Sequence, residues 1–108
     1  YGVANNMTTA STVLTTSTAP SSIKVVAKVN YLDTPTLGTD LMFDVSRDSG
    51  TTWTPVTMVD KGSVGSVRTL ESGFTSVTSQ PAGTSIKYRV RTANNKMVEI
   101  QDVYLTWQ

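Results

Sequence analysis

The side chains available for acid–base or nucleophilic chemistry in this 108-residue chain exclude histidine and cysteine, because the chain contains neither. The commonest general base and metal ligand is therefore missing, and no thiolate can act as a nucleophile or bind a metal. A glycosidase needs two carboxylates that face each other across a cleft. The spacing of the eight Asp and Glu residues selects no such pair. We expect a protein that is not an enzyme and that has no metal and no cofactor.

One stretch has a signature, residues 46–53, which read SRDSGTTW. Ser46 and Asp48 can accept hydrogen bonds from backbone N–H groups in a turn, and Gly50 can adopt the positive φ that tight connections often require. Trp53 is expected to be largely buried, as a large apolar anchor that clamps the returning strand to the core. These residues predict a structural hairpin, with calcium at Asp48 or a sugar stacked on Trp53 as the alternatives.

The same stretch resembles the Asp box, S-x-D-x-G-x-T-W, which recurs in sialidases. Those enzymes carry the box several times, once per propeller blade, and use an arginine cluster and a tyrosine nucleophile elsewhere in a longer chain. This chain has one copy and four arginines in total. Calcium prefers six to eight oxygen ligands, and one Asp with a neighbouring Ser supplies too few. The stretch is therefore interpreted as a hairpin and not as an active site.

Alternation of apolar and polar residues predicts strands wherever a pattern exists, for example over residues 23–31, 41–46 and 86–91. Turn clusters separate the segments, including KGSVGS at 61–66. The final segment changes phase, which predicts a β-bulge at Gln101–Asp102. We expect an all-β, antiparallel β-sandwich that is jelly-roll-like and forms a single domain over residues 1–108. Residues 1–20 are either a strand or an N-terminal arm from a longer protein.

The charge balance limits the partners that the chain can have. Its net charge is +1 and only 16% of its residues are charged, far from the basic balance of a nucleic-acid binder. No apolar run approaches the roughly 18 residues that a membrane span requires. We expect neither nucleic-acid binding nor membrane insertion.

Basic side chains alternate with apolar ones in two predicted strands. If these strands share a sheet, their basic faces form a stripe for an anionic glycan, whereas the ordinary alternative is a solvated face that protects the sheet against edge pairing. The residues concerned are Lys24 and Lys28 in one strand and Lys87, Arg89 and Arg91 in the other.

Tyr104 completes the predicted ligand-binding platform. It is out of phase with Val103 and Leu105, so it should point away from the core. The Asn-Asn-Lys stretch at 94–96 predicts a hairpin that pairs the flanking strands. That pairing would place Tyr104 beside Lys87, Arg89 and Arg91, with the loops 33–40 and 61–66 as alternative locations of the site.

Several motifs together resemble the β-sandwich modules found at the ends of tail fibres, and in other fibre-like structural proteins, of tailed bacteriophages. The likeness extends over roughly residues 7–108, although Asp102 stands where the family pattern has glycine. The motifs are SRDSGTTW at 46–53, QPAGT at 80–84, YRV at 88–90, NNK at 94–96 and LTW at 105–107.

This resemblance implies a virion location and a non-enzymatic tail-fibre or spike terminal domain. The implied partners are a host cell-surface receptor, either a glycan or a protein, and other virion proteins, with the module itself a homotrimer. Two alternatives remain open, namely a head-decoration or fibre-assembly domain that contacts only virion proteins, and a bacterial carbohydrate-binding module.

Overall fold

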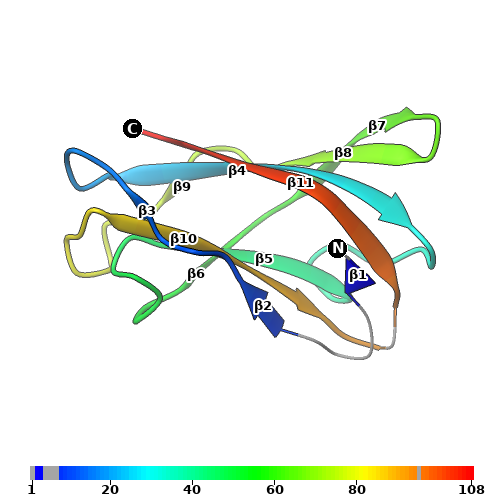
Figure 1. Cartoon of the computed structure of the whole chain (residues 1–108), viewed down its shortest axis with the longest axis horizontal. Helices are drawn as coiled ribbons and strands as arrows, with labels where there is room; N and C mark the ends of the chain where they lie inside the picture. The colour runs from blue at the N-terminus through cyan, green and yellow to red at the C-terminus, as the bar shows by residue number, and fades with distance from the viewer. Residues whose placement is uncertain (1, 4–7, 95) are drawn as a thin grey trace.

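The computed structural model describes residues 2–3, 8–94 and 96–108, and residues 2–3 by their backbone alone. The described residues form two antiparallel sheets that pack face to face as a β-sandwich (Figure 1). No helix occurs among them, and hence no apolar helix of membrane-spanning length. The predicted all-β, antiparallel sandwich is confirmed, while the jelly-roll connectivity stays a prediction.

Sheet A contains six strands and sheet B contains five. In sheet A the order is β1 (Gly2–Val3), β11 (Val98–Trp107), β4 (Ser22–Tyr31), β8 (Val67–Glu71) and β7 (Val59–Val64), and β9 (Thr75–Ser76) also pairs with β4. In sheet B the order is β2 (Thr8–Ala10), β10 (Ser85–Thr92), β5 (Leu41–Ser46) and β6 (Thr54–Val56), and β3 (Leu14–Thr15) also pairs with β10.

The core lies between the two sheets and follows the predicted alternation. Every second residue of β4 from Ile23 to Val29 is fully buried, and Phe43 of β5 and Val90 of β10 face it from sheet B. Burial of large apolar side chains contributes roughly 1.5–3 kcal/mol each, so this layer supplies most of the favourable free energy of folding.

The terminal strand contains the predicted bulge. The register of β11 against β4 is interrupted between Ile100 and Asp102. As a result, Ile100 is buried and Val103 packs partly buried against the same core, although the two residues differ in phase. The extra residue is Gln101, which is exposed.

The turn predicted at residues 61–66 is present but shorter, at Gly65 and Ser66, and the second predicted connection is wrong. Residues 61–64 belong to strand β7 and not to a turn, because β7 runs on to Val64 and the turn of the β7–β8 hairpin is at Gly65, whose φ is +62°. The Asn-Asn-Lys stretch does not join neighbouring strands, since β10 lies in sheet B and β11 in sheet A. Asn95 of that stretch lies outside the described residues, as do residues 1 and 4–7 of the predicted arm.

A polar contact fixes the end of β10 at the point where the chain leaves sheet B. The Asn94 side chain donates a hydrogen bond to Asp40 at 2.6 Å, and the backbone N–H of Ala93 donates to the carbonyl of Asp40 at 2.9 Å. Asn94 also has a positive φ of 58°. The end of β10 is therefore bound to the loop before β5, and the chain then crosses to sheet A, where Leu32 N–H donates to the carbonyl of Met97 at 3.2 Å.

Candidate functional site

The SRDSGTTW turn connects β5 to β6 and is held by its own side chains. Ser46 Oγ accepts the N–H of Gly50 at 2.9 Å and donates to Asp48 Oδ1 at 2.6 Å, and the same carboxylate oxygen accepts the N–H of Thr52 at 2.8 Å. Ser49 and Gly50 both have positive φ, of 60° and 85°. The predicted roles of Ser46, Asp48 and Gly50 in the turn are confirmed.

The ionisation of Asp48 reflects this setting. Burial acts to raise the pKa of Asp48, but the hydrogen bonds from Ser46 and Thr52 together outweigh it, so the pKa lies below its ordinary value. In the described part of the chain no cluster of three His, Cys, Asp or Glu residues that could hold a metal occurs. The role of Asp48 as an acceptor in the turn follows from its hydrogen bonds with Ser46 and Thr52.

Arg47 and Gln80 join this turn to the loop of the QPAGT motif. Arg47 is buried, its backbone N–H donates to Gln80 Oε1 at 2.7 Å, and its guanidinium donates to the carbonyl of Pro20 at 2.9 Å. The Gln80 amide in turn donates to the carbonyl of Val45 at 3.0 Å and to the Thr54 hydroxyl at 2.8 Å. Two motifs that lie far apart in the sequence thus form one polar cluster beneath the turn.

Trp53 is not the buried anchor that the sequence predicts. It is half-buried, it lies outside the apolar core, and the guanidinium of Arg89 lies 4.5 Å from its ring centroid. The reason is the pleat of β6: Val56 points inward opposite Phe43, so Pro55 points outward opposite Asp44, and Trp53 shares the outward phase of Pro55. The residues that anchor the turn are Arg47 and Gln80 instead.

The outer face of sheet B carries a cluster of charges next to Trp53. Arg89 lies directly opposite Asp44 in the β10–β5 register. The Asp44 carboxylate is only 1% exposed and accepts hydrogen bonds from Arg89 Nε at 2.9 Å and from Arg91 Nε and Nη2 at 2.7 and 3.0 Å. The paired arginines stay partly exposed, so the carboxylate is covered while the cations face solvent.

Lys87 extends this face toward the turn. It pairs with Ser46 in the β10–β5 register. A Cβ placed on Gly50 would lie 3.6 Å from Lys87 Nζ and 3.2 Å from Trp53 Cζ2, so the lysine and the indole both lie over the turn. We call Trp53, Lys87, Arg89 and Arg91, with Asp44 beneath them, the cationic face.

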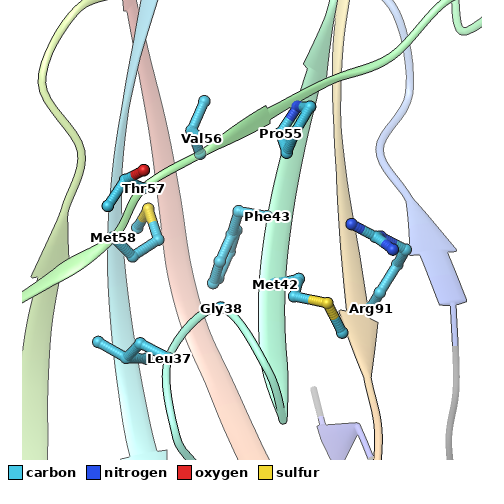
Figure 2. Close-up of a pocket in the computed structure, with 9 residues that line it drawn as sticks. All are labelled: Leu37, Gly38, Met42, Phe43, Pro55, Val56, Thr57, Met58 and Arg91. Atoms are coloured by element: carbon cyan, nitrogen blue, oxygen red, sulfur yellow. The ribbon is translucent and has the colours of Figure 1, made fainter.

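A hollow of about 270 Å³ adjoins the cationic face (Figure 2). Its walls are mostly apolar, and Arg91 is its charged residue. Figure 2 shows the Phe43 ring at the centre of the hollow, between the segment of Thr57 and Met58 and the strand that carries Met42. Ligand pockets typically enclose about 300–1,000 Å³, so this hollow can only supplement the cationic face.

The structure separates the predicted platform into two parts. Lys87, Arg89 and Arg91 share the outer face of sheet B, as predicted. Tyr104 pairs with Val26 in sheet A, on the opposite side of the sandwich, where it is 53% exposed.

Lys24 and Lys28 also lie in sheet A, so they form no stripe with the cations of β10. Lys24 forms an ion pair with Glu71 at 2.6 Å, and Lys28 donates to the Thr69 hydroxyl at 2.8 Å. The side chains that lie beside the cations of β10 are Trp53 and Asp44, and not Tyr104.

The loops named as alternative locations contribute little to this face. From residues 33–40, Leu37 and Gly38 line the hollow. Residues 61–66 belong to the β7–β8 hairpin in sheet A and lie on the other sheet.

Comparisons of this chain with protein-family models, with curated protein sequences and with solved structures find no match. The likeness to phage fibre modules therefore depends on the sequence motifs alone. The structure adds the arrangement of the cationic face, which brings three basic side chains and an indole ring together on one surface.

Proposed function

We propose that this chain is a non-enzymatic virion module, the terminal domain of a tail fibre or spike, that binds an acidic glycan of the host surface through the cationic face. The observation that carries the binding part of the proposal is the array of Trp53, Arg89, Asp44 and Arg91 on one exposed sheet face. The virion context is supported by the resemblance of the sequence motifs to fibre modules.

The charges of the cationic face favour an anionic ligand. Lys87, Arg89 and Arg91 are positive and Asp44 is the negative group among them, so the face has an excess of positive charge. Asp44 fixes both guanidinium groups in place, and Trp53 stacks on one of them. Cations held in position in this way lose less conformational freedom when a carboxylate binds, and arginine binds carboxylates by paired, directed hydrogen bonds.

The neighbouring surface favours a sugar over a nucleic acid. Three cations are few for tracking a phosphate backbone, and the net charge of the whole chain is only +1. A sugar ring presents apolar C–H groups as well as hydroxyls, which suits a half-buried indole and an apolar hollow. The side chains also support binding rather than hydrolysis, because the carboxylate of the face is buried and engaged by two arginines.

The first experiment compares two ligands that differ in charge. Oligogalacturonate and oligogalactose share a sugar skeleton, and only the former carries carboxylates. We expect the chain to bind oligogalacturonate more tightly, and we expect this affinity to fall with added salt, because exposed charges are screened within about 10 Å at 0.1 M salt. Equal affinity for both, or binding of neither, contradicts the proposal.

Matched variants locate the site. Lys87→Gln with Arg89→Gln removes two positive charges from the cationic face and leaves Arg91 to pair with Asp44. Lys24→Gln with Lys28→Gln removes the same charge from sheet A. Only the first pair should weaken binding, by about tenfold or more if each lost charged hydrogen bond contributes roughly 1.5–3 kcal/mol.

A second measurement tests the virion role. An excess of the isolated chain should block adsorption of particles that carry it, and the Lys87→Gln, Arg89→Gln variant should not. If neither form affects adsorption although the glycan binds, the bacterial carbohydrate-binding alternative is favoured over receptor binding, and if the glycan does not bind either, the assembly-domain alternative is favoured.

A further inference from the structure

The hollow beside the cationic face opens where β6 leaves sheet B. Strand β6 pairs with β5 only as far as Phe43, and after Val56 the chain crosses to β7 in sheet A. Past that point the loop before β5 takes the place of a strand, and the N–H of Gly38 donates to the carbonyl of Leu41 at 2.9 Å. In Figure 2 the hollow lies between this loop and the segment that carries Thr57.

The walls of this hollow offer few hydrogen-bonding side chains. Thr57 and Arg91 are the lining residues with polar side chains. A sugar hydroxyl buried against such walls loses its hydrogen bonds with water and gains few in return, whereas an apolar group gains free energy by leaving water. The apolar side chains of the walls are Leu37, Met42, Phe43, Pro55, Val56 and Met58.

Arg91 connects the hollow with the cationic face. It lines the hollow and lies directly opposite Met42 in the β10–β5 register. Its Nε and Nη2 donate to Asp44, and in the described part of the chain no hydrogen bond engages its Nη1. An anionic group that binds this guanidinium therefore lies next to the apolar wall that begins at Met42.

The volume of the hollow limits what can enter it. About 270 Å³ is too small to enclose a whole ligand. A water molecule takes about 30 Å³ in the liquid, so the hollow has room for a substituent of a few atoms, such as an acetyl group. The sugar ring that carries the substituent would stay outside, on the cationic face.

We infer that the acidic sugar bound by the cationic face carries an acetyl group, and that the hollow binds this group while Arg91 binds the carboxylate. The inference rests on the proposed glycan binding and narrows the class of sugar. In a uronic acid C6 is the carboxylate carbon, so an apolar substituent must be attached at another ring position, and an acetyl ester leaves the charge unchanged. The hydroxyl of Thr57, an exposed residue of the wall, can donate a hydrogen bond to the acetyl carbonyl.

Two ligands that differ only in acetylation test the inference. Acetylated oligogalacturonate carries acetyl esters on its ring hydroxyls, and mild alkali converts it to the plain form with the same carboxylates. Calorimetric titration should show that the acetylated form binds about tenfold or more tightly, since one small apolar group in an apolar pocket changes binding by about 10–200-fold. Acetylated oligogalactose, which lacks carboxylates, should bind more weakly than acetylated oligogalacturonate, and equal affinity would overturn the inference.

The methyl signals of the methionines show where the acetyl group binds. Met58 lines the hollow, whereas Met97 is exposed just before β11 of sheet A and serves as the internal control. The two signals can be assigned from Met58→Leu and Met97→Leu. Acetylated oligogalacturonate should shift the Met58 signal, the plain form should leave it in place, and the Met97 signal should stay in place with both.

Two variants alter the hollow without removing a charge. Thr57→Phe fills it from an exposed position, and Met42→Gln makes one wall polar at similar volume. Each should abolish the preference for the acetylated ligand. Thr106→Phe adds the same side chain at an exposed position of sheet A and should preserve the preference. Dispersed amide signals establish that each variant is folded, and either of the first two is sufficient for the test.

Three further results overturn the inference. They are equal affinity for the acetylated and plain ligands, a Met58 signal that the acetylated ligand leaves in place, and a preference for acetylation that both hollow variants retain. If the plain ligand still binds, each of these results leaves the proposed glycan binding unaffected. Binding of neither ligand contradicts the proposed function itself, and the inference with it.

Discussion

The substitution Gly83→Ala tests the contact between the SRDSGTTW turn and the QPAGT loop. A Cβ on Gly83 would lie 2.3 Å from the carbonyl oxygen of Arg47 and 3.4 Å from Cα of Asp48. These are backbone atoms, and Arg47 is also held by Gln80 through its N–H. Neither side can rotate away as a flexible side chain could, so the loop or the turn must shift.

The cost follows from this displacement. Inserting a methyl group into a well-packed site costs typically 1–3 kcal/mol, occasionally more. Moving the backbone here also lengthens the hydrogen bonds of Gln80, and each buried polar group left unpaired costs about 1–3 kcal/mol. We therefore expect a loss of free energy of unfolding at the upper end of that range, about 3 kcal/mol.

Gly73→Ala is the matched control, because a Cβ there meets nothing within 4 Å and Gly73 lies outside the chain's positive-φ glycines. Urea denaturation of both variants measures the difference as a shift of the midpoint at constant slope. Gly73→Ala should be neutral or slightly stabilising. If Gly83→Ala is as stable as Gly73→Ala, the close approach of the two motifs is wrong, and with it the explanation of why they occur together.

Two further predictions concern stability. Phe43→Ala should lower the free energy of unfolding by about 3–5 kcal/mol, as large aromatic truncations in cores do. Trp53→Ala should cost less than half as much, because Phe43 is fully buried and Trp53 lies half-buried on the outer face. Thermal denaturation measures both losses, and equal losses would show that Trp53 belongs to the core. The pKa of Asp48 is lowered on folding from its ordinary value of 3.8, so this group contributes stability that is present above that value and is lost as the pH falls through the folded pKa. The free energy of unfolding should accordingly fall less between about pH 5 and about pH 2 in Asp48→Asn than in the wild type, and parallel pH curves would contradict the role of Asp48 in the turn.

The sequence predicted which face of each strand is buried better than it predicted which strands pair with each other. Alternation depends on which side of a strand is buried, and the same pattern arises in either sheet of a sandwich. The bulge at Gln101–Asp102 was predictable because it changes the phase within one strand. The assignment of β10 and β11 to different sheets was not predictable, since it depends on long-range pairing, of β10 with β5 and of β11 with β4.

The position of Trp53 was predictable in principle. In the segment Trp-Thr-Pro-Val, Val56 points inward and the period of two then places Trp53 outward. The size of the indole favours burial, but its phase in the strand places it on the outer face. Alternation also places Asp44 at an outward position of its strand. Its two hydrogen-bond partners, Arg89 and Arg91, lie 45 and 47 residues further along the chain, so only the strand register reveals them.

The two tryptophans of the chain allow the most direct test of glycan binding at the cationic face. Trp53 lies on the outer face of sheet B beside Arg89, and Trp107 lies at the end of β11 in sheet A. Their indole N–H signals can be assigned from Trp53→Phe and Trp107→Phe and followed during titration with oligogalacturonate, with oligogalactose as the control. We predict that oligogalacturonate shifts the Trp53 signal and leaves the Trp107 signal in place. A shift of Trp107 alone, or of neither signal, would contradict the cationic face as the glycan-binding site.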